Sequence, residues 1–375
     1  MDISARFDRV AGASLLERGL GGISRRYLSR ELKAEKTACY FYHPSRISFA
    51  QTYPFVHYRR NIKDAFGVGM HFRPVDSVLE NPKGCATGVD HFLFQPWFTA
   101  DQEKMTRALD TLKSENPEAT IDFVDTFAHS DLRLGKIVNP YIRHYFKKSV
   151  LRDKTRYFNV RQGYTNLEEY ACETYGLDLP KIDLEVPKDL ISKLRFSPNF
   201  FTAPRFWRTL VASEVPPATE RQIDIHARMD VADDIRKYYR QVAFDAASKI
   251  PGNHVISDQL IPLRKFMAEM ADSKLCLSPF GYGEICWRDI EAVVAGAVLI
   301  KPDMSHMETS PEIYEAGETY LPVQWDYSDL EEVMRPVLED ADFRRHITQN
   351  AWTRLRNYLV NDVFLDDIAD VWEFR

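Results

Sequence analysis

The sequence lacks several features that would each assign the chain to a class of protein. Its 375 residues include only five cysteines, widely spaced and with no CxxC pair, so neither a disulfide framework nor a cysteine zinc site is indicated. No run of about 18–20 uncharged apolar residues occurs, and the amino-terminal segment lacks an apolar core of signal-peptide length. We therefore expect reduced thiols, no transmembrane segment and a cytoplasmic location.

An excess of positive charge is also missing. The chain has 49 lysines and arginines against 55 aspartates and glutamates, which gives a formal net charge of -6 at pH 7. Without such an excess, the chain has no overall field that would attract a nucleic-acid backbone. We therefore expect no nucleic-acid partner.

What the sequence does contain is an alternation of apolar runs with helical patterns, and 45% of its residues are hydrophobic. In the first half, short buried strands are predicted at 39–46, 66–75, 90–97 and 119–127. Strands separated by helices indicate parallel βαβ units.

The alternation is interrupted by a less regular, proline-rich region from residue 152 to about 217, and it restarts at residue 221. We place a domain boundary near "SEVPPATER". The prediction is therefore an α/β chain with two Rossmann-like doubly wound domains, 1–215 and 216–375, the second of which ends in a helical tail. In the tail, four apolar residues at helical spacing predict that the last helix crosses back to the first domain: Phe364, Ile368, Val371 and Trp372.

One segment of the second domain has a pattern typical of an anion site. "LSPFGYGEICWRDIEAVVAGAVLIKPD" (277–303) reads as the end of a strand, a loop with Gly281, Tyr282 and Gly283, a helix, and another strand. In a doubly wound sheet, ligands bind at the carboxyl ends of the strands, where a helix N-terminus offers N–H groups and a partial positive charge. The two glycines would let the backbone approach an anion closely.

The helix that follows this loop is expected to carry Glu284, Arg288 and Glu291 in its first turns. The planar guanidinium of Arg288 suits phosphate oxygens. The carboxylate of Glu291, on nearly the same helix face, is a natural acceptor for the two vicinal hydroxyls of a ribose. Together they describe a nucleotide-diphosphate site. The alternative is a surface pair of opposite charges.

The stretch "SKLCLSPFGYGEICWRDIEAVVAGAVLIKPD" resembles the nucleotide-sugar segment of exostosin-like glycosyltransferases, whose pattern is S-K-F-x-L-x-P-x-G, a small loop, R-x-x-E-A-x-x-x-G and an apolar strand. It is similar, more loosely, to the E-x7-E region of two-domain (GT-B) glycosyltransferases. The resemblance implies a GT-B fold, with Arg288 contacting phosphate and Glu291 binding ribose. The spacing from Glu284 to Glu291 is one residue short of E-x7-E, which argues against sugar contact by Glu284. Phe280 stands where many exostosin-like proteins have a basic residue.

Other candidates lie near other predicted strand ends. Arg228 ends the first strand of the second domain, where it would reach the donor phosphates. Asp125, His129 and Asp131 lie at and after the end of the strand at 119–127, on the facing wall of a cleft, and each is a candidate general base. Solvated loop charges and helix caps produce the same pattern.

The sequence gives little sign of a metal site. Its only D-x-D match, at Asp340 and Asp342, falls in the helical tail and not at a strand end. We expect no metal and no other cofactor, so that Arg288, Arg228 and the helix N-terminus would stabilise the leaving diphosphate.

These observations predict a metal-independent glycosyltransferase of hexosyl or deoxyhexosyl type. Its donor, a UDP- or GDP-sugar, would bind mainly to the second domain, and a glycan or glycoconjugate acceptor would bind to the first. Two alternatives stay open: a non-catalytic nucleotide-sugar or glycan-binding protein, and a nucleotide-sugar epimerase.

Overall fold

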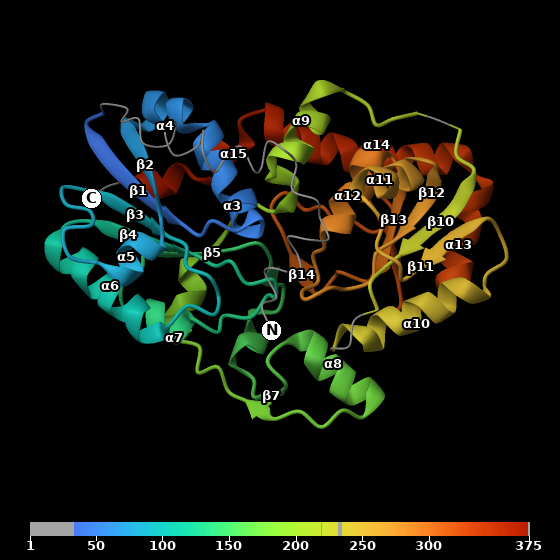
Figure 1. Cartoon of the computed structure of the whole chain (residues 1–375), viewed down its shortest axis with the longest axis horizontal. Coiled ribbons are helices and arrows are strands. Elements are labelled where there is room, and N and C mark those ends of the chain that lie inside the picture. Colours follow the sequence, from blue (N-terminus) through green and yellow to red (C-terminus); the bar gives the residue numbers. More distant parts are fainter. Residues whose placement is uncertain (1–33, 219, 232–234, 374–375) are drawn as a thin grey trace.

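The computed structural model describes residues 34–218, 220–231 and 235–373, and these residues form two parallel sheets (Figure 1). The first sheet has six strands in the order β2-β1-β3-β4-β5-β9, and the second has five in the order β11-β10-β12-β13-β15. All neighbouring strands in both sheets pair in parallel. The predicted α/β architecture with two doubly wound sheets is confirmed. We call the parts built on these two sheets the first and the second lobe.

The first lobe occupies the blue and teal half of Figure 1. Its strands are β1 (Lys36–Tyr42), β2 (Val68–Pro74), β3 (His91–Phe94), β4 (Thr120–Val124), β5 (His144–Lys147) and β9 (Leu194–Phe196). Its helices are α3 (Arg46–His57), α4 (Arg59–Phe66), α5 (Asp76–Glu80), α6 (Gln102–Glu115) and α7 (Gly135–Val138). All four residues of β3 are buried, as expected of a strand with helices on both faces.

The second lobe repeats this plan in the yellow and orange half of Figure 1. Its strands are β10 (Ile223–Arg228), β11 (His254–Ser257), β12 (Ser273–Leu277), β13 (Val298–Pro302) and β15 (Leu321–Val323). Its helices are α10 (Arg236–Lys249), α11 (Leu263–Ala271), α12 (Trp287–Ala295), α13 (Leu330–Glu339) and α14 (Ala341–Val360). The boundary predicted at residue 215 stays a prediction, in the segment between α9 (Pro204–Ala212) and β10.

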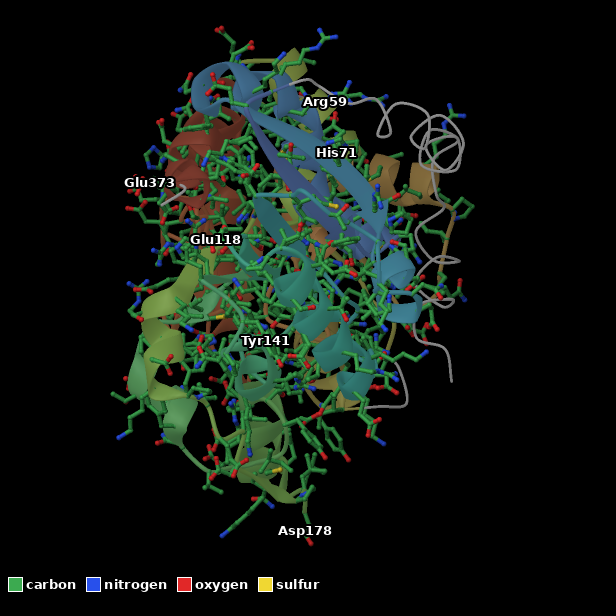
Figure 2. All side chains as sticks on the ribbon, turned by 90° about the vertical axis from the view of Figure 1, so that its left-hand side faces the viewer. Arg59, His71, Glu118, Tyr141, Asp178 and Glu373 are labelled. Atoms are coloured by element: carbon green, nitrogen blue, oxygen red, sulfur yellow. The ribbon has the colours of Figure 1, made fainter. Side chains whose placement is uncertain are left out.

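The proline-rich region contains more regular structure than the sequence pattern indicated. It follows β6 (Val150–Leu151), and in addition to β9 it contains η1 (Lys154–Phe158), β7 (Arg161–Gln162), α8 (Asn166–Tyr175), β8 (Lys181–Ile182), η2 (Lys188–Lys193), η3 (Phe200–Thr202) and α9. Helix α8 has clear caps, because the Thr165 hydroxyl accepts from the amide of Glu168 and Gly176 ends the helix at φ 67°. In Figure 2 this region extends to the lower tip of the molecule, where Asp178 is labelled.

The end of the chain crosses back to the first lobe, as predicted. Helix α15 (Val363–Asp367) and η4 (Ala369–Trp372) follow α14, and α15 lies beside α3 in Figure 1. The Phe364 ring packs edge-on against Phe55 at 5.0 Å, and the Tyr58 hydroxyl donates to the carbonyl of Leu359 at 2.8 Å. Trp372 is buried against His91. Through these contacts the tail joins the two lobes. Each such buried apolar side chain stabilises the fold by roughly 1.5–3 kcal/mol.

Candidate functional site

The predicted anion loop lies between β12 and α12, at the carboxyl end of the second sheet. Helix α12 begins at Trp287, with Cys286 as its N-cap in extended backbone. Asp289 fixes this start, because its carboxylate accepts from the amide of Cys286 at 2.9 Å and from the Tyr314 hydroxyl at 2.6 Å. The expectation that Glu284 lies in the helix is wrong: Glu284 belongs to the loop, two residues before the N-cap.

The two loop glycines have different neighbours. A Cβ on Gly283 would lie 2.1 Å from the carbonyl oxygen of Ala128, a backbone atom of the first lobe. The Gly281 amide donates to the carbonyl of Gly283 at 3.1 Å, and a Cβ there would lie 3.2 Å from the sulfur of Cys286. Only glycine fits at 283, because the facing loop of the first lobe touches it. The two loops therefore meet across the interface between the lobes.

Several guanidinium groups surround this loop. The Arg288 guanidinium donates to the carbonyl of Arg228 at 2.8 Å, and its buried Nε has no hydrogen-bond partner among the described residues. Arg240 donates to the carbonyls of Phe280 at 3.2 Å and Asp230 at 2.7 Å. Within the described ranges neither arginine is in an ion pair with a carboxylate. Burial and the nearby charge of Arg288 lower the pKa of Arg240 to about 10. Such positive charge beside the start of α12 suits an anion.

Arg236 and Arg228 complete this group of guanidinium side chains. The Arg236 guanidinium lies 4.1 Å from the centre of the Tyr282 ring, which places both beside the loop. Arg228 instead forms a bidentate ion pair with Glu269, with N···O distances of 2.9 and 3.2 Å. Its charge is already compensated, which favours a framework role over the predicted phosphate contact.

Glu284 is a buried polar group at the interface whose hydrogen-bonding capacity is not used by the described residues. Its side chain is fully buried, and neither carboxylate oxygen has a hydrogen-bond partner among the described residues. The nearest histidine nitrogen is Nε2 of His306, at 4.0 Å. His129 of the first lobe is buried as well, and its Nδ1 is also unpartnered. Burial lowers the pKa of His129 to about 4, so its imidazole is neutral at pH 7. Buried polar atoms without partners are costly, which marks this cluster as a place for a polar ligand.

The two carboxylates of the facing loop differ from Glu284, because their oxygens are occupied. Asp125 accepts from the Tyr145 hydroxyl and the Lys147 ammonium, each at 2.7 Å, and from the amide of Phe127. Asp131 accepts from two nitrogens of Arg133, at 2.9 and 2.7 Å. These contacts favour a framework role for both aspartates. Among the three predicted bases, His129 is the one with an unpartnered atom.

Glu291 and Trp287 lie on α12 beside the first lobe. The Glu291 carboxylate accepts from Arg205 of α9 at 2.8 Å, and the pair is largely buried. The Trp287 ring stacks on Phe200 at 4.6 Å, and the Arg205 guanidinium lies 4.8 Å from its centre. Glu291 and Arg288 therefore have separate partners, despite their predicted common face. The ribose role of Glu291 stays a prediction.

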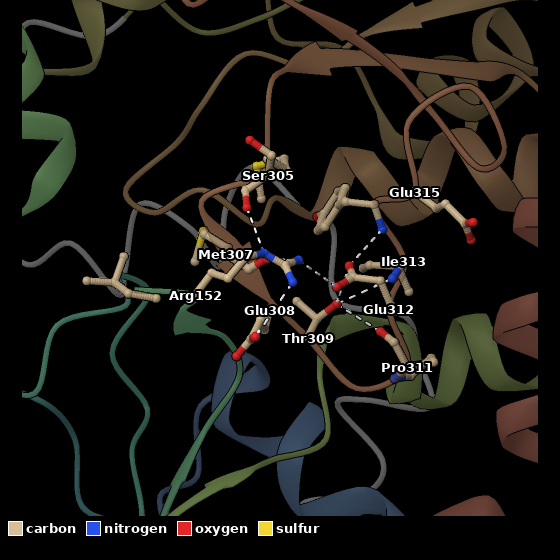
Figure 3. Close-up of polar contacts among 12 residues, drawn as sticks. Arg152, Ser305, Met307, Glu308, Thr309, Pro311, Glu312, Ile313 and Glu315 are labelled. Atoms are coloured by element: carbon tan, nitrogen blue, oxygen red, sulfur yellow. Dashed lines mark hydrogen bonds and ion pairs between the residues drawn. The ribbon is translucent and has the colours of Figure 1, made fainter. Parts of the chain in front are cut away.

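A short antiparallel ribbon fixes the position of His306, and Figure 3 shows the contacts of Arg152 with Ser305 and Met307 on either side of it. Strand β6 of the first lobe pairs with β14 (Met307–Glu308) of the second. The Arg152 amide donates to the carbonyl of His306 at 2.8 Å, and its guanidinium donates to the carbonyls of Ser305 at 2.9 Å and Met307 at 3.1 Å. The ribbon thus holds the lobes together next to the Glu284 cluster.

Sequence reasoning missed several members of this site. Arg236 and Arg240 follow the end of β10, and His306 follows the end of β13, so the strand-end rule that selected Arg228 could have found all three. No sequence signal indicates that Glu284 lacks partners, because that depends on how the two lobes meet.

Two kinds of feature are not found in the described part of the chain. No group of three or more His, Cys, Asp or Glu side chains there could hold a metal ion. Asp340 caps α14 by accepting from the amides of Asp342 and Phe343. Among the described residues, no helix combines the length and apolar composition needed to span a bilayer.

Comparison with known proteins supports the fold. No family model and no curated protein sequence matches the chain. It is similar to an α-glucosyltransferase solved with UDP and a 13-mer DNA that contains an HMU base, at 11% identity and a TM-score of 0.50, covering 90% of this chain and 98% of that one. It is also similar to WaaG, a glycosyltransferase involved in lipopolysaccharide biosynthesis, at 13% identity and a TM-score of 0.39, covering 90% and 99%. The fold is therefore of the predicted GT-B type, while the exostosin-like resemblance stays a prediction.

Proposed function

We propose that the chain is a glycosyltransferase that moves a sugar, of hexosyl or deoxyhexosyl type, from a UDP- or GDP-sugar to a hydroxyl acceptor. The observation that carries this proposal is the fully buried Glu284, whose two oxygens have no hydrogen-bond partner among the described residues, beside a neutral His129. Arg240 and Arg288 lie beside the same loop, and in the described ranges neither pairs with a carboxylate. Hydroxyl groups of the donor sugar would donate to Glu284, which leaves His129 for the acceptor. The attached diphosphate would lie at the start of α12.

The proposed chemistry uses these charges in the transition state. The acceptor hydroxyl oxygen forms a bond to the anomeric carbon, and the bond from that carbon to the diphosphate oxygen breaks with its electron pair. Negative charge then grows on the diphosphate, where Arg288 and the α12 N-terminus can stabilise it without a metal. The hydroxyl proton passes to a base, for which the unpartnered Nδ1 of His129 is the best placed of the three predicted candidates.

A donor-hydrolysis assay with product analysis tests this proposal. The protein is incubated with UDP- and GDP-sugars, and the products are separated and identified. Slow release of the nucleotide diphosphate and the free sugar supports a transferase. Release of an isomerised sugar would indicate an epimerase, and binding without turnover would indicate a binding protein. The five free cysteines support the further proposal of a reducing, cytoplasmic compartment.

A further inference from the structure

The first lobe contains a pocket, formed at the ends of three neighbouring strands. Its volume is about 210 Å³. It is lined by His43 after β1, Asp76 and Glu80 of α5 after β2, and Trp97 and Lys104 after β3. Carboxyl ends of parallel strands are the usual ligand-binding edge of such a sheet.

We propose that this pocket binds a neutral sugar unit of the acceptor, a proposal that rests on the glycosyl transfer proposed above. Its wall includes an aromatic platform, because the rings of His43 and Trp97 stack at 4.7 Å with an angle of 25°. The platform has a polar edge as well. His43 Nδ1 accepts from the amide of Ser45 at 3.3 Å, so the ring proton lies on Nε2, a donor for a hydroxyl oxygen.

The charges of the pocket select against an anionic acceptor. Three carboxylates, Asp76, Glu80 and Asp101, line it together with one ammonium group, Lys104. Lys104 is paired with Glu80 at 2.7 Å, and Asp101 caps α6 by accepting from the Lys104 amide. In the described ranges, Asp76 has no ion-pair partner. A carboxylate accepts hydroxyl donors but repels phosphate, so the pocket suits a polyol and not a nucleic-acid backbone.

A continuous series of rings connects this pocket to the donor side. Trp97 contacts Phe98, Phe98 contacts Phe127, and Phe127 contacts His129, each with ring centres 4.8 Å apart. The rings of Trp97 and His129 therefore lie no more than about 14 Å apart. Arg46, three residues after His43, also lies over the Trp287 ring of the second lobe at 5.0 Å. An acceptor held at Trp97 can thus extend toward the Glu284 cluster.

Saturation-transfer NMR tests the proposal with defined probes. The probes are methyl glycosides of glucose, galactose and mannose, with glucose 6-phosphate and a short single-stranded DNA as anionic competitors. We expect the full-length protein to bind at least one methyl glycoside. The signal should fall at least fivefold in Trp97→Ala and at least threefold in Asp76→Asn, and glucose 6-phosphate should bind at least threefold more weakly than the neutral sugar. The matched control is Asp64→Asn, because Asp64 is an exposed carboxylate on α4.

The proposal is overturned if no methyl glycoside binds, if Trp97→Ala and Asp76→Asn bind as the wild type does, or if the anionic probes bind as well as the neutral ones. Asp76 is exposed, so Asp76→Asn keeps the test valid even if Trp97→Ala does not fold. UDP and GDP are titrated into the same samples. Loss of all nucleotide binding with sugar binding intact would reject the donor chemistry and support the pocket as a sugar site.

Discussion

Two loops meet at the interface between the lobes, and they differ in how many hydrogen-bond partners their buried carboxylates have. In the loop of the first lobe, Asp125 and Asp131 are buried and their oxygens accept from lysine, tyrosine, arginine or backbone donors. In the loop of the second lobe, Glu284 is equally buried and has no such donors among the described residues. A position after a strand end is therefore shared by framework groups and by the group that we propose binds ligand. The two kinds differ in whether other residues of the protein donate hydrogen bonds to them.

The largest expected effect would come from Asp125→Asn, which leaves the buried ammonium of Lys147 without its charged partner. Removing one member of a buried ion pair costs about 3–5 kcal/mol in unfolding free energy. Glu284→Gln is the contrasting variant: among the described residues the carboxylate has no hydrogen-bond donor and a long ion pair with His306 at 4.0 Å, so the unfolding free energy should change much less. Urea unfolding measures both. An equal loss of unfolding free energy in the two variants would show that the protein compensates both carboxylates to the same extent.

Arg288 should matter for turnover more than for folding. Its guanidinium faces the proposed diphosphate, so Arg288→Ala should lower turnover by roughly 10²–10³, comparable to removing one oxyanion donor. Arg288→Lys keeps the charge but loses the planar fork, and should cost about 10-fold, with a smaller change in donor affinity. Steady-state kinetics with the identified donor check this. Turnover within twofold of wild type for both variants would make Arg288 structural.

The pH dependence of stability reports on His129. Its pKa is about 4 in the folded chain and about 6.5 when unfolded. The unfolded state therefore binds a proton first as the pH falls, so stability present above pH 6.5 is lost between about pH 6.5 and 4, by about 3 kcal/mol. His226, whose pKa is lowered to about 3 mainly by burial, acts in the same sense. His129→Gln should remove its share of the slope in urea unfolding at pH 7.5, 5.5 and 4. An unchanged slope would show that His129 is not a buried neutral imidazole.

The smallest effect is expected in the helical tail. Asp342 is 86% exposed, and among the described residues its ion-pair partner is the exposed Arg345. Asp342→Asn should leave donor turnover unchanged, with and without added manganese, because this D-x-D match is not at the proposed site. If Asp342→Asn abolished a stimulation of turnover by manganese, this would indicate that Asp342 helps to bind a metal ion that turnover requires.

The fold was largely predictable from the sequence, because parallel strands covered on both faces leave continuous apolar runs such as 297–300. The loop between β12 and α12 was predictable too, since a strand end followed by glycines and a helix is a local pattern; its anion binding stays a prediction. The burial of Glu284 and its lack of hydrogen-bond donors among the described residues were not predictable, because its neighbours His129 and His306 are distant in sequence. Gly283 shows the same limit, because its close neighbour is Ala128 of the other lobe.

A crystal structure of the full chain soaked with UDP and, separately, GDP would show whether the loop before α12 holds the donor. We expect the diphosphate at the start of α12, within hydrogen-bond distance of the Arg288 guanidinium, with the sugar side of the nucleotide directed toward Glu284. A diphosphate bound elsewhere, or crystals that take up neither nucleotide while calorimetry in solution also shows no binding, would contradict the assignment of this loop as the donor site.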